Sequence, residues 1–273
     1  MNDFESYADV AKVEPITLTT YRNLYKRLYE CLGKGVKTIS QKKIIDSVNK
    51  LNMTPNTKDA LIKVAIIIKK HHNKPFKQLN NFKISLQNNI QTYNNNKKQT
   101  LKKELPSKED LFKYLEVLKN NENKIIEYLV NYLIIHFNTR NKDLNVVITK
   151  LRNVANNKND NYLYINNKQK RVEYIRNIYK TDATYGQKIN IITDLDFINK
   201  ISQLKQKYLL ETKDKQRINQ TSLNKVVSRM TLNNLGTANY FKILSTSVDK
   251  KDLNKLSNNR GTDVKTIINN YVL

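Results

Sequence analysis

The spacing of the apolar residues changes along the chain, and this change constrains the fold more than any other feature. Apolar residues recur every three or four positions over 16–70, 105–137 and from 197 to the end, which predicts helices. Residues 162–165, 172–179 and 189–192 are instead rich in Tyr, Ile and Val, which favour strands. We therefore expect an α+β protein, mainly α-helical, with one small antiparallel β-sheet.

Capping residues divide the helical regions. Thr54 and Pro55 predict the start of a helix, and Ser107, followed by Glu109 and Asp110, predicts another. Helices are then expected over 111–118 and 124–137, and later over 197–208, 223–230, 240–244, 253–256 and 264–271. A weaker helix is expected over 82–93, and the polar, basic residues 94–104 are interpreted as a linker. This gives a helical domain at 1–93, a linker at 94–104 and a second domain at 105–273.

The charge of the chain indicates its partner. Lysine and arginine total 49 against 24 acidic residues, so the net charge is +25. An AT-rich coding sequence also raises Lys and Asn, but that bias should raise Glu as well, and Glu has not kept pace. A polyphosphate is the natural partner for such a chain, so we expect it to bind nucleic acid.

Several classes of protein are disfavoured. Cys31 is the single cysteine, His71 and His72 are adjacent, and His136 is isolated, so no metal site or cofactor is expected. Residues 1–5 lack the features of a signal peptide, and no apolar run approaches the roughly 20 residues that span a bilayer. We find no basic amphipathic helix with aromatic anchors, so a membrane partner is not expected. These features predict a soluble, intracellular protein.

Three motifs carry a resemblance to a known family. Thr139-Arg140-Asn141-Lys142-Asp143-Leu144 follows an apolar helix, Tyr179-Lys180-Thr181 precedes a turn at Tyr185-Gly186, and Leu256-Ser257-Asn258-Asn259-Arg260-Gly261-Thr262 leads to Tyr271. In order and spacing this resembles the tyrosine recombinases, or phage-type integrases, whose catalytic domain is related to that of type IB topoisomerases. The resemblance implies a helical core-binding domain followed by a catalytic domain. It also implies that Arg140 is the first catalytic arginine, Lys180 the general acid and Tyr271 the nucleophile.

The sequence departs from the family pattern at three further positions. Asn239 stands where the family has His, Lys242 where it has a second arginine, and Thr262 where His or Trp is usual. Arg229 is an alternative second arginine, but it precedes the Leu235-Gly236 segment, so Lys242 is preferred. These substitutions predict reduced or absent activity, because lysine offers a point charge where arginine offers a planar, bidentate fork.

The chemistry implied by the resemblance explains these residue types. A tyrosine hydroxyl attacks a DNA phosphodiester to form a 3′-phosphotyrosyl bond, and cationic donors stabilise the charge on the phosphoryl oxygens. Further DNA contacts are expected at Arg260, Lys188, Arg229, Lys69 and Lys70. Each residue also has a structural interpretation, since a tyrosine beside an apolar helix face usually packs in the core. Tyr185 and Gly186 most simply shape a turn.

Three functions remain open at this level. The first is a DNA recombinase or integrase that clamps duplex DNA. The second is a catalytically decayed relative that packages or organises DNA, and the third is a type IB topoisomerase. Only Val272 and Leu273 follow Tyr271, so any homo-oligomer on DNA is expected to assemble without a C-terminal docking helix. Composition and the family's usual occurrence suggest a virus or mobile element as the source.

Overall fold

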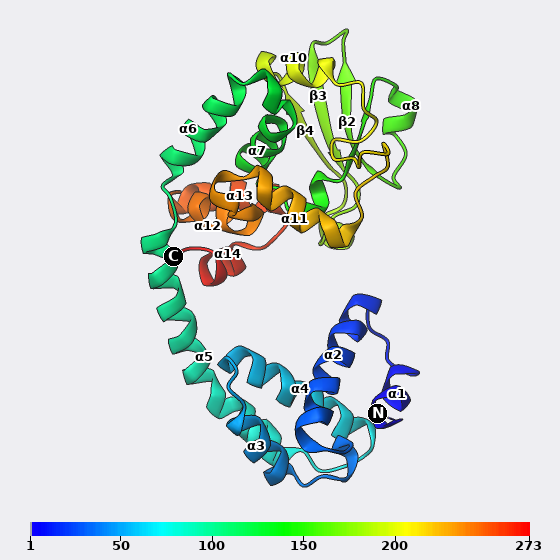
Figure 1. Cartoon of the computed structure of the whole chain (residues 1–273), viewed down its shortest axis with the longest axis vertical. Helices are drawn as coiled ribbons and strands as arrows, with labels where there is room; N and C mark the ends of the chain where they lie inside the picture. The colour runs from blue at the N-terminus through cyan, green and yellow to red at the C-terminus, as the bar shows by residue number, and fades with distance from the viewer. Residues whose placement is uncertain (1) are drawn as a thin grey trace. The chain divides into compact units, whose positions relative to one another are not determined.

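The computed structural model describes residues 2–273, with the side chain of Lys250 left out, and it divides into two compact units. One unit ends at Thr100 and the other comprises Leu101–Leu273 (Figure 1). Each unit has its own hydrophobic core. The α+β class expected from the sequence is confirmed, because the chain is mostly helical and carries one small sheet.

The N-terminal unit is a helical bundle. It contains α1 (Asn2–Ala8), α2 (Pro15–Leu32), the 3-10 turn η1 (Val36–Thr38), α3 (Gln41–Lys50), α4 (Pro55–His71) and the start of α5 (Lys77–Glu104). Its core is formed by buried apolar residues of all these elements, including Phe4, Tyr25 and Leu61. Thr54 caps α4 by accepting a hydrogen bond from the N–H of Thr57, as the sequence predicted.

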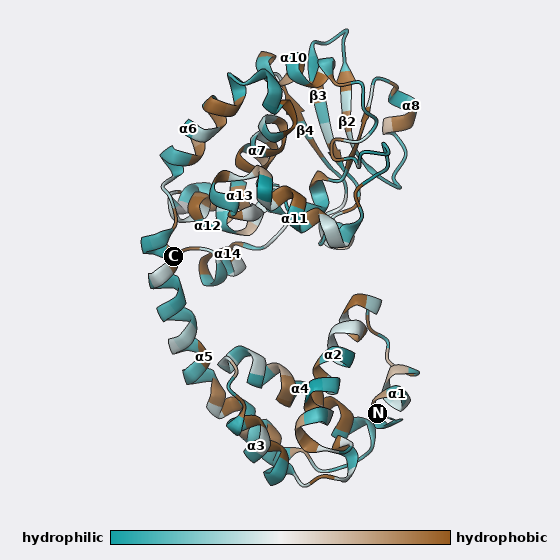
Figure 2. Ribbon diagram, in the orientation of Figure 1, coloured by the Kyte–Doolittle hydropathy of each residue, from teal (hydrophilic) through white to brown (hydrophobic). Residues whose placement is uncertain are grey.

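Helix α5 is longer than the sequence suggested. The expected end at Tyr93 is wrong, because the helix continues through 94–104 to Glu104. Its buried residues, Leu79 and Leu86, lie in its first half, and Figure 2 shows the remainder as largely hydrophilic. Residues 94–104 lack Pro and Gly, so nothing in their sequence interrupts the helix that begins at Lys77. The division between the units falls within this helix, at Thr100.

The second unit begins with two helices that the sequence predicted. Ser107 and Asp110 form a capping box at the start of α6 (Lys108–Lys119). Helix α7 (Ile125–Phe137) is buried from Tyr128 to Ile135 and forms the centre of the core. The remaining helices of this unit are α8 (Arg152–Ala155), α9 (Asp182–Tyr185), α10 (Leu195–Gln203), α11 (Gln220–Met230), α12 (Gly236–Thr246), α13 (Leu253–Arg260) and α14 (Val264–Asn270).

Within residues 2–273 the strands form one four-stranded sheet with the order β1-β2-β3-β4. Three strands lie where expected: β2 (Asn161–Asn166), β3 (Arg171–Arg176) and β4 (Lys188–Ile192) pair antiparallel. The first, β1 (Val146–Thr149), was not predicted and pairs parallel with β2. The sheet is therefore mixed rather than antiparallel. The segment between β1 and β2, which includes α8, supplies the crossover that parallel pairing needs.

The two faces of the sheet pack against different parts of the unit. Leu163 and Tyr174 face the helical core around α7. Their neighbours Tyr162 and Ile175 belong to a smaller cluster with Ala155 of α8, on the other side of the sheet in Figure 1. β3 is covered on both faces, whereas Ile189 and Ile191 of β4 are exposed. The end of β3 and the start of β4 carry the basic side chains described next.

Candidate functional site

Arg140 lies in a short turn after α7, and two features of the sequence, at Asn138 and Asp143, hold this turn in place. Asn138 ends α7 in the left-handed conformation, with φ +53°. Asp143 then accepts a hydrogen bond from the N–H of Arg140, at 3.1 Å between the nitrogen and Oδ2. The Arg-x-x-Asp spacing noted in the sequence is therefore explained locally, because Asp143 caps the turn that begins at Arg140.

The Arg140 side chain reaches the end of α13. Its Nη1 donates to the carbonyl of Arg260 at 2.5 Å, and its Nη2 donates to the carbonyl of Gly261 at 3.4 Å. The structure thus brings together two motifs that lie 120 positions apart in the sequence. Arg140 remains partly exposed, and a guanidinium has five N–H donors, so these contacts leave donors free for another acceptor.

The side chain of Arg260 points into the interior of the unit and is 4% exposed. Its Nη1 donates to the carbonyls of Asn138 and Thr139 at 3.1 and 3.4 Å, and its guanidinium carbon lies 4.2 Å from the ring centre of Phe241. Burial and the nearby Arg140 lower the pKa of Arg260 to about 10. Arg260 was expected to contact DNA, but its buried guanidinium is out of reach of a bound phosphate in this conformation.

Tyr271 follows α14 and packs beside Arg260. The guanidinium carbon of Arg260 lies 5.5 Å from the ring centre of Tyr271. The Tyr271 ring meets the Phe241 ring edge to face, with 4.8 Å between the centres. Thr262 lies in the connection between α13 and α14, directly after Gly261, and its carbonyl accepts from Ser257. Arg140, Arg260 and Tyr271 are thus brought together.

A second pair of cations extends the cluster toward the sheet. Arg176, at the end of β3, is fully buried, donates to the carbonyl of Asn259 at 2.9 Å, and lies 3.7 Å from the fully buried carboxylate of Asp143. The ammonium of Lys188, at the start of β4, donates a hydrogen bond to the carbonyl of Asn258. The Asp143 carboxylate is close enough to interact electrostatically with Arg140, Arg176, Arg260 and Lys188.

We call Arg140, Arg176, Arg260 and Lys188 the cationic cluster. These side chains come from four different segments, and Asp143 offsets one of their charges. Like charges held together with so little compensation are costly unless an anion binds beside them. Arg140 and Lys188, the two members that remain partly exposed, are therefore suited to binding a phosphate, and the planar guanidinium of Arg140 is a good match for its oxygens.

Lys180, the residue expected to supply the proton, lies just outside this cluster. Its side chain is exposed, in the connection between β3 and β4. The adjacent Thr181 instead contacts the site, since its hydroxyl donates to the carbonyl of Gly261 at 2.6 Å. At the turn expected at Tyr185 and Gly186, the short helix α9 ends at Tyr185, and Gly186 follows it with φ +65°.

The remaining residues expected to act in catalysis lie on α12. The Asn239 amide donates to the carbonyl of Leu235 in its own helix at 3.2 Å, so one of its donors is committed to the backbone. Lys242 is partly buried and directly follows Phe241, whose ring supports both Arg260 and Tyr271. Figure 1 shows α12, α13 and α14 close together at the orange-to-red end of the chain.

Three further cations were expected to contact DNA. Arg229 is exposed at the end of α11, and Lys70 is exposed near the end of α4 in the N-terminal unit. Lys69 is 4% exposed, and its ammonium donates to the carbonyls of Lys37 and Ile39 at 3.1 and 2.6 Å. The structure does not support a phosphate contact for Lys69, because its donors hold the η1 turn in place.

Two functional residues were missed in the sequence. Arg176 lies within a strand-like segment, two positions after Tyr174 and hence on the same inward face, which was the signal that could have identified it. Phe241 carried no expectation from the sequence. Its role in supporting Arg260 depends on α13 packing beside α12, which no local pattern reveals.

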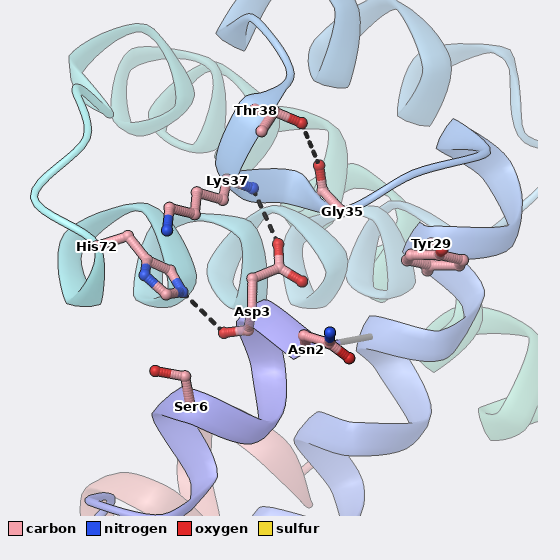
Figure 3. Close-up of a pocket in the computed structure, with 8 residues that line it drawn as sticks. All are labelled: Asn2, Asp3, Ser6, Tyr29, Gly35, Lys37, Thr38 and His72. Carbon is pink, nitrogen blue, oxygen red and sulfur yellow. Dashed lines mark hydrogen bonds between the residues drawn. The ribbon is translucent and has the colours of Figure 1, made fainter.

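A pocket of about 540 Å³ in the N-terminal unit is a weaker candidate (Figure 3). The Asp3 carboxylate there is occupied by Tyr25 and by the N–H of Lys37, at 3.0 Å for the latter. Nε2 of the His72 ring forms a hydrogen bond with the Asp3 carbonyl at 2.9 Å. These contacts tie α1 to η1 and α4, so we interpret the polar groups as structural.

Among residues 2–273, no group of three or more His, Cys, Asp or Glu side chains is arranged to hold a metal ion. In the same described part of the chain, every helix is too short or too polar to cross a membrane.

Comparisons with known proteins give a structural likeness but no match by sequence. No protein-family model matches the chain, and no curated protein matches it. The structure is similar to a crystal structure of XerA recombinase, with a TM-score of 0.39 and 13% sequence identity, over 100% of this chain and 92% of that chain.

Proposed function

We propose that this chain is a tyrosine recombinase-like protein that binds duplex DNA and cleaves one strand by attack of Tyr271 on a phosphodiester. One observation carries the proposal: the partly exposed Tyr271 lies beside Arg260, a member of the cationic cluster. Tyr271 also packs against apolar residues such as Phe241, but an ordinary core tyrosine has no guanidinium beside its ring. A tyrosine that reacts with a phosphate needs cations beside it, because the transition state concentrates negative charge on the phosphoryl oxygens.

The members of the cluster have different tasks in this proposal. Arg140 is partly exposed and retains free donors, so it is the member suited to contact the phosphoryl oxygens directly. Arg260 is buried and acts through Tyr271, because its guanidinium packs against the Tyr271 ring. Arg176 binds the carbonyl of Asn259 in α13 and pairs with Asp143, so it holds these two parts of the site together.

The charge of the whole chain supports DNA as the partner. A net charge of +25 favours a long polyanion over a single small phosphate. Binding by many phosphate contacts releases counterions, so the affinity for duplex DNA should fall steeply as salt is raised. A flat salt dependence would remove the basis of the proposal.

A second candidate function is DNA binding without cleavage. It is favoured by the commitment of Arg140 and Arg260 to main-chain carbonyls, and of Asn239 to its own helix. In that case the same cations stabilise the α12–α14 region and bind phosphate, but no covalent intermediate forms.

Suicide DNA substrates distinguish the two functions. A nicked duplex that traps the covalent intermediate should give a protein–DNA adduct with the unaltered chain and none with Tyr271→Phe. Tyr185→Phe removes another exposed hydroxyl of the same unit and serves as the matched control. Retained DNA binding with no adduct on any tested sequence supports the binding function. If adducts form, joining of two sites indicates a recombinase and relaxation of a supercoiled plasmid indicates a topoisomerase.

A further inference from the structure

The face of the sheet that points toward α8 carries two arginines that share one buried carboxylate. Side chains alternate along β3, so Arg171 and Glu173 lie on the same face as Ile175, which packs in a cluster with Ala155 of α8. Glu173 is 4% exposed. One of its oxygens accepts a hydrogen bond from Arg152 of α8, and the other accepts from Arg171 at 2.7 Å. The carboxylate therefore holds two guanidinium groups beside each other.

Both arginines remain open to a ligand. The side chains of Arg152 and Arg171 are 48% and 33% exposed. The Arg152 guanidinium also lies 5.2 Å from the ring centre of Tyr164, which limits its movement further. A guanidinium has five N–H donors, and a fixed, planar one is well suited to the oxygens of a phosphate.

Exposed lysines surround the two arginines. Lys150 and Lys168 line a pocket of about 430 Å³ whose wall includes Tyr164. Lys207 lies beside β1, because its carbonyl accepts a hydrogen bond from the N–H of Ile148 at 2.8 Å. These cations come from five separate places in the sequence. We call them the outer basic surface: Lys150, Arg152, Lys168, Arg171 and Lys207.

The composition of the outer basic surface favours nucleic acid over a protein as its partner. Lysine is depleted in protein–protein interfaces, whereas lysine and arginine together are typical of surfaces that bind a phosphate backbone. Glu173, which pairs with both arginines, offsets one of the positive charges. The remaining charge is best compensated by a polyanion.

The outer basic surface is separate from the cationic cluster. Arg176 lies on the same face of β3 as Tyr174, which packs around α7, whereas Arg171 lies on the opposite face. Arg171 and Arg176 are also the two ends of β3, which places them about 17 Å apart at the usual rise of a strand. The sheet therefore lies between the two groups of cations, and each group can have its own ligand.

We propose that the outer basic surface binds a second DNA duplex while the cationic cluster holds the first. The inference rests on the duplex binding of the proposed function, but not on cleavage by Tyr271. The two arginines held by Glu173 contact phosphate oxygens as planar forks, and the lysines around them contact neighbouring phosphates as point charges. One chain thereby brings two duplexes together, as the joining of two DNA sites requires.

The number of short duplexes bound per chain tests this inference. Tyr271→Phe serves as the parent chain, so that no strand is cut, and native mass spectrometry counts the duplexes on each chain. We expect complexes of one chain with two duplexes. When Lys150→Gln is combined with Lys168→Gln, the first duplex should bind as before. The second should bind roughly 10-fold more weakly, and the slope of its log affinity against log salt, measured by calorimetry, should fall by about two.

Two further variants make the result specific. Lys113→Gln combined with Lys255→Gln removes the same charge at exposed positions of α6 and α13, so the second duplex should bind with unchanged affinity. Arg152→Lys keeps the charge but loses the planar fork, so the second duplex should bind several-fold more weakly. Unchanged affinity in Arg152→Lys would overturn the role given to the paired arginines.

The outcomes separate this inference from the proposed function. If the parent chain binds no duplex, both fail. If it binds one duplex per chain, or if both pairs of lysine substitutions weaken the second duplex equally, the inference fails and the proposed function stands. The outer basic surface would then be left to an acidic protein partner. Loss of the first duplex on changing Lys150 and Lys168 would place these lysines on the path of that duplex and would also overturn the inference.

Discussion

The guanidinium carbon of Arg260 lies 5.5 Å from the ring centre of Tyr271. The same guanidinium holds the carbonyls of Asn138 and Thr139, immediately before Arg140. Arg260 therefore fixes the nucleophile proposed here relative to the arginine proposed to bind the phosphate. Its burial makes it a positioning residue rather than a direct phosphate contact.

Replacing Arg260 should separate cleavage from DNA binding. Arg260→Met removes the contact to Tyr271 and leaves the buried carbonyls without donors, so we expect adduct formation to fall roughly 100-fold. The free energy of unfolding should fall by about 1–3 kcal/mol. Noncovalent affinity for duplex DNA, measured by anisotropy, should change little. Arg27→Met, at an exposed position of α2, is the control, and a large loss of affinity in Arg260→Met would contradict the positioning role.

Two adjacent lysines should give opposite results. Lys69→Met removes the donors to the Lys37 and Ile39 carbonyls, so the free energy of unfolding should fall by about 1–3 kcal/mol, measured by urea denaturation. Lys70→Met should leave stability nearly unchanged and weaken DNA binding, because its side chain is exposed. Weaker DNA binding by a fully folded Lys69→Met would contradict this distinction.

Lys188 should make stability depend on pH in a defined direction. Its pKa is about 8 in the folded chain and near 10.5 when unfolded. Between these values the unfolded chain binds more protons, so the contribution of Lys188 to the free energy of unfolding rises with pH. The unaltered chain should therefore gain stability relative to Lys188→Met between pH 8 and 10. A stability difference that is constant over this range would contradict the lowered pKa.

Gly261 should tolerate no side chain. Its φ is +63°, and a Cβ would lie 2.9 Å from both the Thr181 hydroxyl and Cε2 of Tyr179. Gly33 also has a left-handed φ, +72°, but no atom of the described residues lies within 4 Å of its Cβ position. Gly33→Ala should cost about 1–2 kcal/mol of unfolding free energy, from the backbone alone. Gly261→Ala should cost more and also abolish adduct formation, because the α13–α14 turn must move. Equal losses in the two variants would rule out the close packing at Gly261.

The features predicted correctly from the sequence depend on local interactions. Thr54 and Ser107 cap helices within three residues of their own position. The strands β2, β3 and β4 could be predicted because their segments are rich in Tyr, Ile and Val. By contrast, β1 is a short apolar run of four residues directly after a helix, and its parallel partner lies beyond α8. Such a run has no period that distinguishes it from a buried helical segment.

The site was predicted only in part, because several of its contacts join distant segments. Arg140 and Tyr271 follow recognisable motifs, and the structure brings both to Arg260. Lys69 is buried because α4 turns its side chain toward the carbonyls of Lys37 and Ile39, which lie about thirty positions earlier in the sequence. The side chain of Lys70 is exposed. Likewise, the contrast between Lys180 and Lys188 depends on the packing of α13 against the start of β4. Residue type and spacing do not determine these relationships.

The central claim is that the oxygen of Tyr271 becomes bonded to DNA phosphorus, and peptide mapping of the trapped adduct tests it most directly. Trypsin cuts after Lys265 and releases residues 266–273, a peptide in which Tyr271 is the one tyrosine. After nuclease digestion, mass spectrometry should find the nucleotide remnant on this peptide, with fragment ions that assign it to Tyr271. A remnant on any other tyrosine, or on a serine, would contradict the account.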